Sequence, residues 1–216
     1  MLSQVRDLFQ QCGGPNGDVP HHNYDKALPW PFDEEDYIDV DTGRVAREQL
    51  RDHPADKPFY MKVSFCGPHK PYDAPQRYLD MFPLEREDDF LLPEGQQITP
   101  ADKEALWRQR RSSKAMIKLI DDQIGLILDL LEERGMLEDT LILFTSDHGD
   151  MLGDHYLLQK GVPWRQAVNV PLAVRLPGAA PIGENPSPVE LSDLAATILD
   201  YAGLDPVEAL SRSWPA

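Results

Sequence analysis

The chain has 216 residues, which is enough for one domain with a hydrophobic core or for part of a larger domain. Its 37 acidic residues outnumber 21 basic ones, and the formal net charge is −16. Such a surface repels phosphate backbones and anionic lipid head groups, so neither nucleic acid nor a membrane is an expected partner. The two cysteines, Cys12 and Cys66, are too few for a disulfide framework.

Residues 1–40 are rich in glycine and proline and predict an irregular lead-in segment, with His21 and His22 on its surface. This segment begins without the basic and apolar regions of a secretory signal, and the compartment stays open. No apolar run in the chain reaches the roughly 18 residues that a membrane span needs.

The next elements predict a short helix followed by a strand. The helix is expected at 41–53, capped by Asp41 or Thr42. The largely apolar run "KPFYMKVSF" at 57–65 has the length of a buried strand and ends in "CGPHKPYDAP". A proline-rich exit from a strand is a suitable place for functional residues.

A long helix is expected at 99–135. Thr99 suits its N-cap, Pro100 its first helical position and Asp102 the capping-box position. Gly135 ends the pattern. Apolar residues at helical spacing predict one buried face, made of Met116, Ile117, Ile120, Ile124, Ile127, Leu128 and Leu131.

Two further strands and a helix follow, at 140–146 ("TLILFTS"), 170–178 ("VPLAVRLPG") and 188–203. A strand, a crossover with a long helix and another strand are typical of a βαβ unit. The sequence therefore predicts the α/β class, with a mostly parallel sheet flanked by helices.

Asp147 and His148 stand where the strand at 140–146 must stop, because Gly149 follows them. Ligands of parallel sheets bind at this end of the strands. A carboxylate suits Mg²⁺ or Ca²⁺, and an imidazole widens the choice toward Zn²⁺ or Mn²⁺. An Asp-His pair alone also fits a turn-capping Asp beside a surface His.

The longer motifs are more specific. The stretch "FTSDHGDMLGDHYLLQKG", taken with "KPFYMKVSFCGPHKPYDAPQRYLDMF", "MIKLIDDQIG" and "VPLAVRLPG", resembles the sulfatase family of the alkaline-phosphatase-like superfamily. The resemblance covers residues 34–212 in one consistent order. It implies an incomplete sulfatase core in which 41–216 form the middle-to-late part of the catalytic domain.

The resemblance also implies roles for individual residues. Asp147 and His148 become metal ligands, with Ca²⁺ expected and Mg²⁺ as the alternative. His69 and Lys160 become the catalytic and substrate-binding residues that contact the sulfate group of a small-molecule or sugar sulfate ester. The formylglycine nucleophile of the family is expected upstream of Met1, so this chain is expected not to hydrolyse sulfate esters unaided.

Other residues of these motifs receive structural roles. Cys66 resembles the start of a nucleophile motif, but no Leu-Thr-Gly element follows, and we interpret it as a small buried residue. Asp150 and Asp154 are expected to cap or solvate the glycine-rich turn, and His155 to support it.

Three alternatives stay open. The chain fits a phosphonate or phosphate ester hydrolase of the same superfamily, or a non-catalytic binding module with the same fold. An independent zinc site made by His148, His155 and the nearby aspartates is the third. The natural substrate and the oligomeric state are not indicated by the sequence.

Overall fold

The computed structural model describes residues 27–180 and 183–213. Cys12, His21 and His22 therefore lie outside the described residues, as does most of the expected lead-in. The helices and strands are α2 (Ile38–Asp52), α3 (Gln76–Leu79), α4 (Pro100–Glu133), β1 (Ile142–Thr145), α5 (Arg165–Val168), β2 (Leu172–Arg175), α6 (Asp193–Tyr201) and α7 (Pro206–Ser213).

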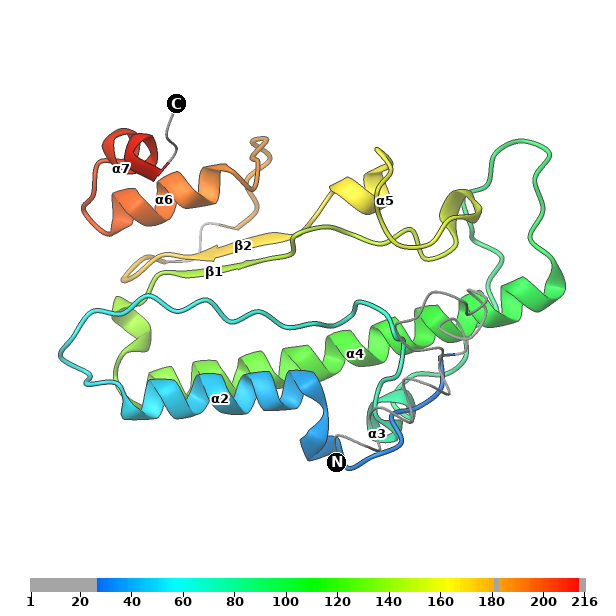
Figure 1. The fold of residues 1–216 in the computed structure, drawn as a ribbon, viewed down its shortest axis with the longest axis horizontal. Coiled ribbons are helices and arrows are strands. Elements are labelled where there is room, and N and C mark those ends of the chain that lie inside the picture. The colour runs from blue at the N-terminus through cyan, green and yellow to red at the C-terminus, as the bar shows by residue number, and fades with distance from the viewer. Residues whose placement is uncertain (1–26, 181–182, 214–216) are drawn as a thin grey trace.

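The two longest helices, α2 and α4, pack side by side and form the base of the molecule (Figure 1). α2 begins three residues before the expected range, at Ile38. Its N-cap is Tyr37, whose side chain makes no cap hydrogen bond, so the expected cap at Asp41 or Thr42 is wrong. Because the side chains of Tyr37 and Asp39 are buried, tertiary packing fixes this helix start.

Both ends of α4 agree with the sequence prediction. The Thr99 hydroxyl accepts a hydrogen bond from the Asp102 amide at 3.2 Å, and Pro100 occupies the first turn. Gly135 follows the helix with φ +66°, the left-handed conformation that glycine adopts most easily. Along the predicted apolar face the exception is Ile117, which is 53% exposed.

Residues 57–65 do not form the predicted strand. Phe59, Met61, Val63 and Phe65 pack against the cluster between α2 and α4, while the residues between them are exposed. This alternation has the period of a strand. The segment nevertheless lacks a ladder partner among the described residues, so the βαβ unit expected between 57–65 and 140–146 is not formed.

The described sheet has two strands, β1 and β2, which pair antiparallel with Ile142 opposite Arg175 and Thr145 opposite Leu172. The expected parallel pairing is therefore not seen in this part of the chain. The connection between the strands contains only single-turn helices, so the chain turns back along β1 instead of crossing over.

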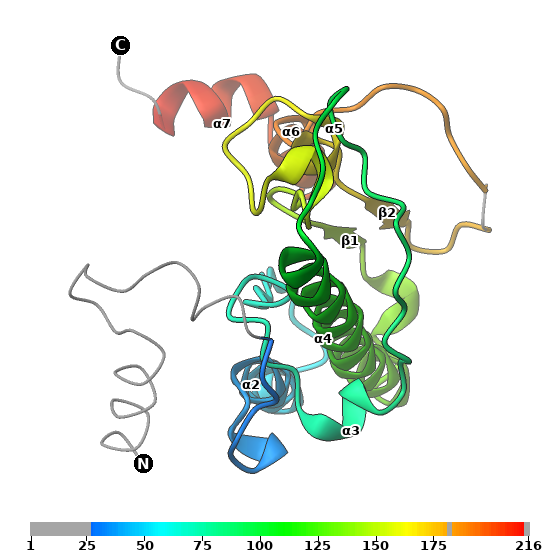
Figure 2. The ribbon, with the colours of Figure 1, turned by 90° about the vertical axis from the view of Figure 1, so that its right-hand side faces the viewer.

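The elements are arranged in layers. Figure 2 shows α4 obliquely, with α2 to one side of it and the β1–β2 sheet above it. The segment that follows α2 runs between the helix pair and the sheet, and α6 and α7 lie beyond the sheet (Figure 1). Within 27–180 and 183–213, no helix combines the length and the apolarity that a membrane crossing requires.

Candidate active site

His69 lies in a turn whose backbone amides are hydrogen-bonded to a buried carboxylate. One oxygen of Asp39 in α2 accepts the Cys66 amide at 2.6 Å, and the other accepts the Gly67 amide at 2.9 Å. A Cβ at Gly67 would lie 2.6 Å from the Asp39 carboxylate, so this contact requires glycine. The His69 amide donates to the Cys66 carbonyl at 3.2 Å and closes the turn. Cys66 is exposed, so its interpretation as a buried residue is wrong.

Asp39 belongs to a small acidic cluster under this turn. Its side chain is fully buried, and burial raises its pKa although the two amide bonds act in the opposite direction. The Tyr37 hydroxyl donates to Asp73 at 3.3 Å. Burial raises the pKa of Asp73 to about 6, and burial also raises the pKa of Tyr37. Burial of these groups costs folding free energy. Within the cluster, Asp39 makes the hydrogen bonds to the turn before His69.

The side chains of His69 and Lys160 are in direct contact. His69 Nδ1 lies 2.8 Å from the Lys70 carbonyl, which can only accept, so Nδ1 carries the proton. The Lys160 ammonium lies 2.7 Å from Nε2 and donates to it. Both side chains are exposed. Two residues separated by 91 positions therefore present their polar ends at one point on the surface.

Asp147 and His148 follow β1 after one intervening residue, Ser146. His148 Nδ1 lies 2.8 Å from the Gly149 carbonyl, which leaves Nε2 as the open nitrogen. That nitrogen is 3.7 Å from the Asp147 carboxylate, whose side chain is 87% exposed. The Gly149 amide donates to Ala167, and a Cβ at Gly149 would lie 1.9 Å from the Gln166 carbonyl oxygen. Only glycine allows the chain to leave the strand this close to α5.

The four predicted residues form one continuous group. The ring centres of His69 and His148 are 6.2 Å apart, with an interplanar angle of 68°. Since His69 contacts Lys160 and His148 lies beside Asp147, each member is linked to the next. In both histidines Nδ1 is bound to a backbone carbonyl, so Nε2 of His148 is left for a ligand, whereas Nε2 of His69 accepts the Lys160 ammonium.

The glycine-rich loop between β1 and Lys160 is held by Asp150, as the sequence predicts. One oxygen of Asp150 accepts the amides of Leu152 at 3.0 Å and Gln159 at 2.9 Å. The other oxygen accepts the Tyr72 hydroxyl at 3.0 Å. Asp150 therefore contacts both the loop that leads to Lys160 and the segment that follows His69.

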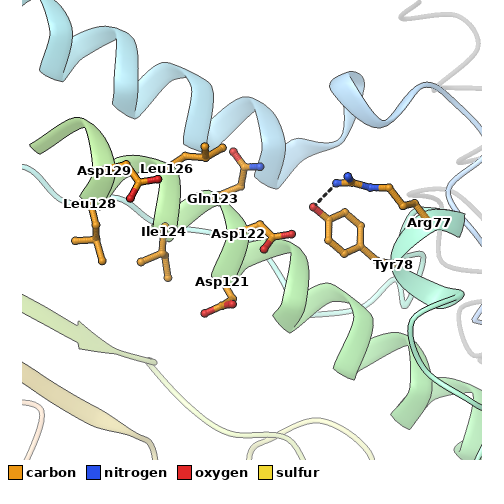
Figure 3. Close-up of a pocket in the computed structure, with 10 residues that line it drawn as sticks. Arg77, Tyr78, Asp121, Asp122, Gln123, Ile124, Leu126, Leu128 and Asp129 are labelled. Atoms are coloured by element: carbon orange, nitrogen blue, oxygen red, sulfur yellow. Dashed lines mark hydrogen bonds between the residues drawn. The ribbon is translucent and has the colours of Figure 1, made fainter. Parts of the chain in front are cut away.

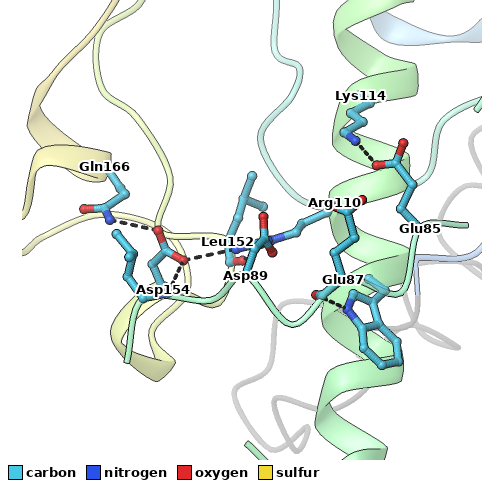
Figure 4. A network of polar contacts seen from close by, with 10 residues as sticks. Glu85, Glu87, Asp89, Arg110, Lys114, Leu152, Asp154 and Gln166 are labelled. Carbon is cyan, nitrogen blue, oxygen red and sulfur yellow. Dashed lines mark hydrogen bonds and ion pairs between the residues drawn. The ribbon is translucent and has the colours of Figure 1, made fainter. Parts of the chain in front are cut away.

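Asp154 neither caps nor solvates the turn, contrary to expectation, since its side chain is only 13% exposed. It joins three segments instead, because it accepts bonds from the Leu91 amide at 3.1 Å, from Arg110 at 3.1 Å and from Gln166 at 2.8 Å (Figure 4). Arg110 also pairs with Asp89 and donates to the Leu152 carbonyl. This network fastens the loop and residues 86–98 to α4.

His155 supports the loop. Its amide donates to the Leu91 carbonyl, and its ring stacks on Trp164 with a centroid distance of 4.0 Å and an interplanar angle of 8°. Across the part of the chain that the structure describes, no three His, Cys, Asp or Glu side chains are grouped closely enough to hold a metal ion. The alternative zinc site of His148, His155 and the aspartates is therefore not formed.

The donor set at the end of β1 fits a divalent cation in chemistry. It consists of an exposed carboxylate and an imidazole nitrogen that backbone bonding leaves open. Hard cations take about six to eight ligands, mainly oxygen, so these two residues supply only part of a coordination shell.

A separate groove lies between α3 and α4, and Figure 3 shows its lining. There the Arg77 guanidinium donates to the Tyr78 hydroxyl at 2.7 Å, and burial raises the pKa of Tyr78 to about 12. The carboxylates of Asp121 and Asp122 pair with Lys118. None of the four predicted residues lines this groove, and three of its charged residues, Arg77, Asp121 and Asp122, are paired within the protein.

Two residues of the site were not identified by sequence reasoning. Asp39 acts across 27 positions and Tyr72 across 78, and neither stands in a motif that indicates its partner. The place of Asp39 in the first turn of a helix was the one signal available. It is a weak signal, because aspartate is common there for electrostatic reasons.

The chain is similar to known proteins along most of its length. A model of the family described as Sulfatase matches residues 6–204. The arylsulfatase of Clostridium perfringens is 35% identical over 86% of this chain and 43% of its own length. The choline-sulfatase of Rhizobium meliloti is 34% identical over 79% of this chain and 36% of its own length. The chain thus spans less than half the length of these relatives.

A solved structure shares the fold. The phosphonate monoester hydrolase of Silicibacter pomeroyi superposes with a TM-score of 0.65 at 24% identity, over 91% of this chain and 46% of that chain. The expected α/β alkaline-phosphatase-like fold class is thereby confirmed, and the small described sheet is consistent with part of such a domain. The chain belongs to the sulfatase family, whose members are sulfuric ester hydrolases.

Proposed function

We propose that this chain forms the sulfate-binding part of a sulfatase that acts on a small-molecule or sugar sulfate ester. The observation that carries the proposal is the 2.7 Å contact between Lys160 and His69, with the His148 ring 6.2 Å from that of His69. The four side chains offer an ammonium group, two imidazoles and a carboxylate to one ligand.

Lys160 and His69 are the substrate-binding and catalytic residues in this proposal. The ammonium of Lys160 has three protons, and only one is directed at His69 Nε2. The others are available to non-bridging sulfate oxygens. His69 would protonate the leaving alcohol through Nε2, which would receive its proton from the Lys160 ammonium 2.7 Å away while Nδ1 stays bound to the Lys70 carbonyl.

Asp147 and His148 would hold the divalent cation, for which Ca²⁺ is expected and Mg²⁺ is the alternative. When bound, such a cation stabilises the negative charge that grows on the sulfuryl oxygens during hydrolysis. Asp147 would contribute its exposed carboxylate and His148 its open Nε2.

The attacking nucleophile is not assigned to any of these four residues. We expect the formylglycine of the family to supply it from a part of the full-length protein outside this chain. The isolated chain should then bind sulfate but leave sulfate esters intact. Hydrolysis of nitrophenyl sulfate by the pure chain, lost on Lys160→Ala, would disprove that statement.

A phosphonate or phosphate ester hydrolase is the second candidate. Its substrate is also a tetrahedral oxyanion, and a phosphonate monoester hydrolase shares the fold. The same four side chains would bind either group, so the order of affinities must decide between them.

Titration of the chain with inorganic sulfate and with inorganic phosphate, in the presence of Ca²⁺, tests the proposal. We expect sulfate to bind more tightly, and Lys160→Met to weaken it by about tenfold or more. Lys62→Met is the matched control, because it removes the same charge from an exposed position elsewhere. Equal losses for the two variants would contradict the proposal, and tighter phosphate binding would favour the second candidate.

A further inference from the structure

Asp150 makes contacts that local turn formation does not require. Both of its oxygens are used, one by two amides of its own loop and the other by the hydroxyl of Tyr72. The Tyr72 bond spans 78 positions of the chain. An aspartate that only stabilised the turn would leave its second oxygen to solvent.

The loop bonds of Asp150 fix the point from which Lys160 extends. The Gln159 amide donates to Asp150, and the Gln159 carbonyl accepts from the Met151 amide at 2.9 Å. These two bonds close the neck of the loop one residue before Lys160. Gln159 has φ +65° there, a strained conformation for this residue type, so the backbone stays in place only while its bonds persist.

The Tyr72 bond ties this neck to the opposite side of the site. Tyr72 is three residues past His69 and only 2% exposed. It belongs to the buried cluster that includes Ala115, Met116 and Leu119 of α4. Because the Tyr72 ring is packed in the helical core, its hydroxyl has a fixed position, and the polar loop is hydrogen-bonded to it.

We propose that Asp150 is a positioning residue that, through Tyr72, sets the contact between Lys160 and His69. A lysine side chain has much rotamer freedom, so its amine reaches a given point reliably only if the backbone before it is anchored. The catalytic importance of this anchoring rests on the proposed function. The anchoring itself is a property of the free chain.

The first test needs no ligand. The ¹⁵N resonance of His69 Nε2 reports the hydrogen bond from Lys160, and Lys160→Met gives its value without that bond. Tyr72→Phe removes only the hydroxyl, and Asp150→Ala removes all three bonds. Both should move the resonance toward the Lys160→Met value, Asp150→Ala further than Tyr72→Phe.

Asp205→Ala is the matched control, because Asp205 likewise accepts two backbone amides, those of Val207 and Glu208, before α7. It should leave the resonance unchanged. Wild-type resonances in Tyr72→Phe and Asp150→Ala would overturn the proposal. Thermal unfolding of each variant shows whether it is folded. If Asp150→Ala does not fold, Tyr72→Phe still tests the proposal, because it retains the buried ring.

A double-mutant cycle with inorganic sulfate tests the consequence for binding. We expect Tyr72→Phe to weaken sulfate binding by about three- to tenfold when Lys160 is present and less than about twofold in Lys160→Met. Equal effects in both backgrounds would mean that Tyr72 acts only on general stability, and would overturn the positioning role. If the wild-type chain binds no sulfate, the proposed function fails, while the His69 resonance still decides the role of Asp150.

Discussion

The two sides of the site are held by different means. On the His69 side, a fully buried carboxylate, Asp39, binds the backbone of the turn, and the chain then enters the core with Tyr72 and Ala74. On the Lys160 side, hydrogen bonds and ion pairs of Asp150 and Asp154 hold a loop with several positive φ angles. Burial makes the first side rigid, whereas the second side depends on individual polar contacts.

This difference predicts different responses to mutation. Loss of a contact on the His69 side should lower the free energy of unfolding of the whole chain, because the contact lies in the core. Loss of a contact on the Lys160 side should mainly open the loop, since local opening costs less than global unfolding.

The largest effect is expected for Asp39→Ala. The change leaves the partly buried amides of Cys66 and Gly67 without their acceptor. It should lower the free energy of unfolding by about 2–4 kcal/mol, measured by urea denaturation. Asp41→Ala in the same helix is the control, because Asp41 is exposed. Similar losses for the two variants would show that the His69 side is not held by burial.

A smaller, pH-dependent effect is expected for Asp73→Asn. Burial raises the pKa of Asp73 to about 6, above the 3.8 of an unperturbed aspartate. The folded state therefore holds this proton more tightly than the unfolded state does, and the stability that it contributes is lost as pH rises from about 4 to about 6.

Asparagine does not titrate, but its side chain can still accept the hydrogen bond from the Tyr37 hydroxyl. As the pH is raised from 4 to 7, the free energy of unfolding of Asp73→Asn should thus increase by about 1–3 kcal/mol relative to that of the wild type. Unfolding curves at the two pH values measure this gain. A constant difference between the variant and the wild type would be inconsistent with a raised pKa in the folded state.

The smallest effect on global stability is expected for Arg110→Met. Arg110 and Asp154 are 22% and 13% exposed, and their pair fastens the loop to α4 (Figure 4). Amide hydrogen exchange of Leu91 and His155 should accelerate by about fivefold or more, with little change in global unfolding. Arg108→Met, which removes an exposed pair with Glu104, provides the comparison. Unchanged exchange at both amides would show that this network does not fasten the loop to α4.

The sequence predicted those features that depend on local chemistry. The ends of α4 followed from Thr99, Pro100 and Gly135, because caps and turns are formed by neighbouring residues. The position of Asp147 and His148 followed from the break that Gly149 makes in an apolar strand.

Features that depend on distant partners were not predicted. The run at 57–65 has the apolar alternation of a strand, but pairing also needs a neighbour at the right edge. The role of Asp39 depends on a turn 27 positions away, and that of Asp154 on Arg110 in another element. Periodicity shows which face of an element is buried, but it does not identify the partner.

The central claim is that the pair at the end of β1 and the His69–Lys160 pair serve one ligand. The most direct test is the dissociation constant of inorganic sulfate, measured with and without saturating Ca²⁺. We expect tighter sulfate binding with Ca²⁺, an equal reciprocal effect of sulfate on Ca²⁺ affinity, and loss of both effects in Asp147→Asn. The same dissociation constant with and without Ca²⁺ would contradict the claim.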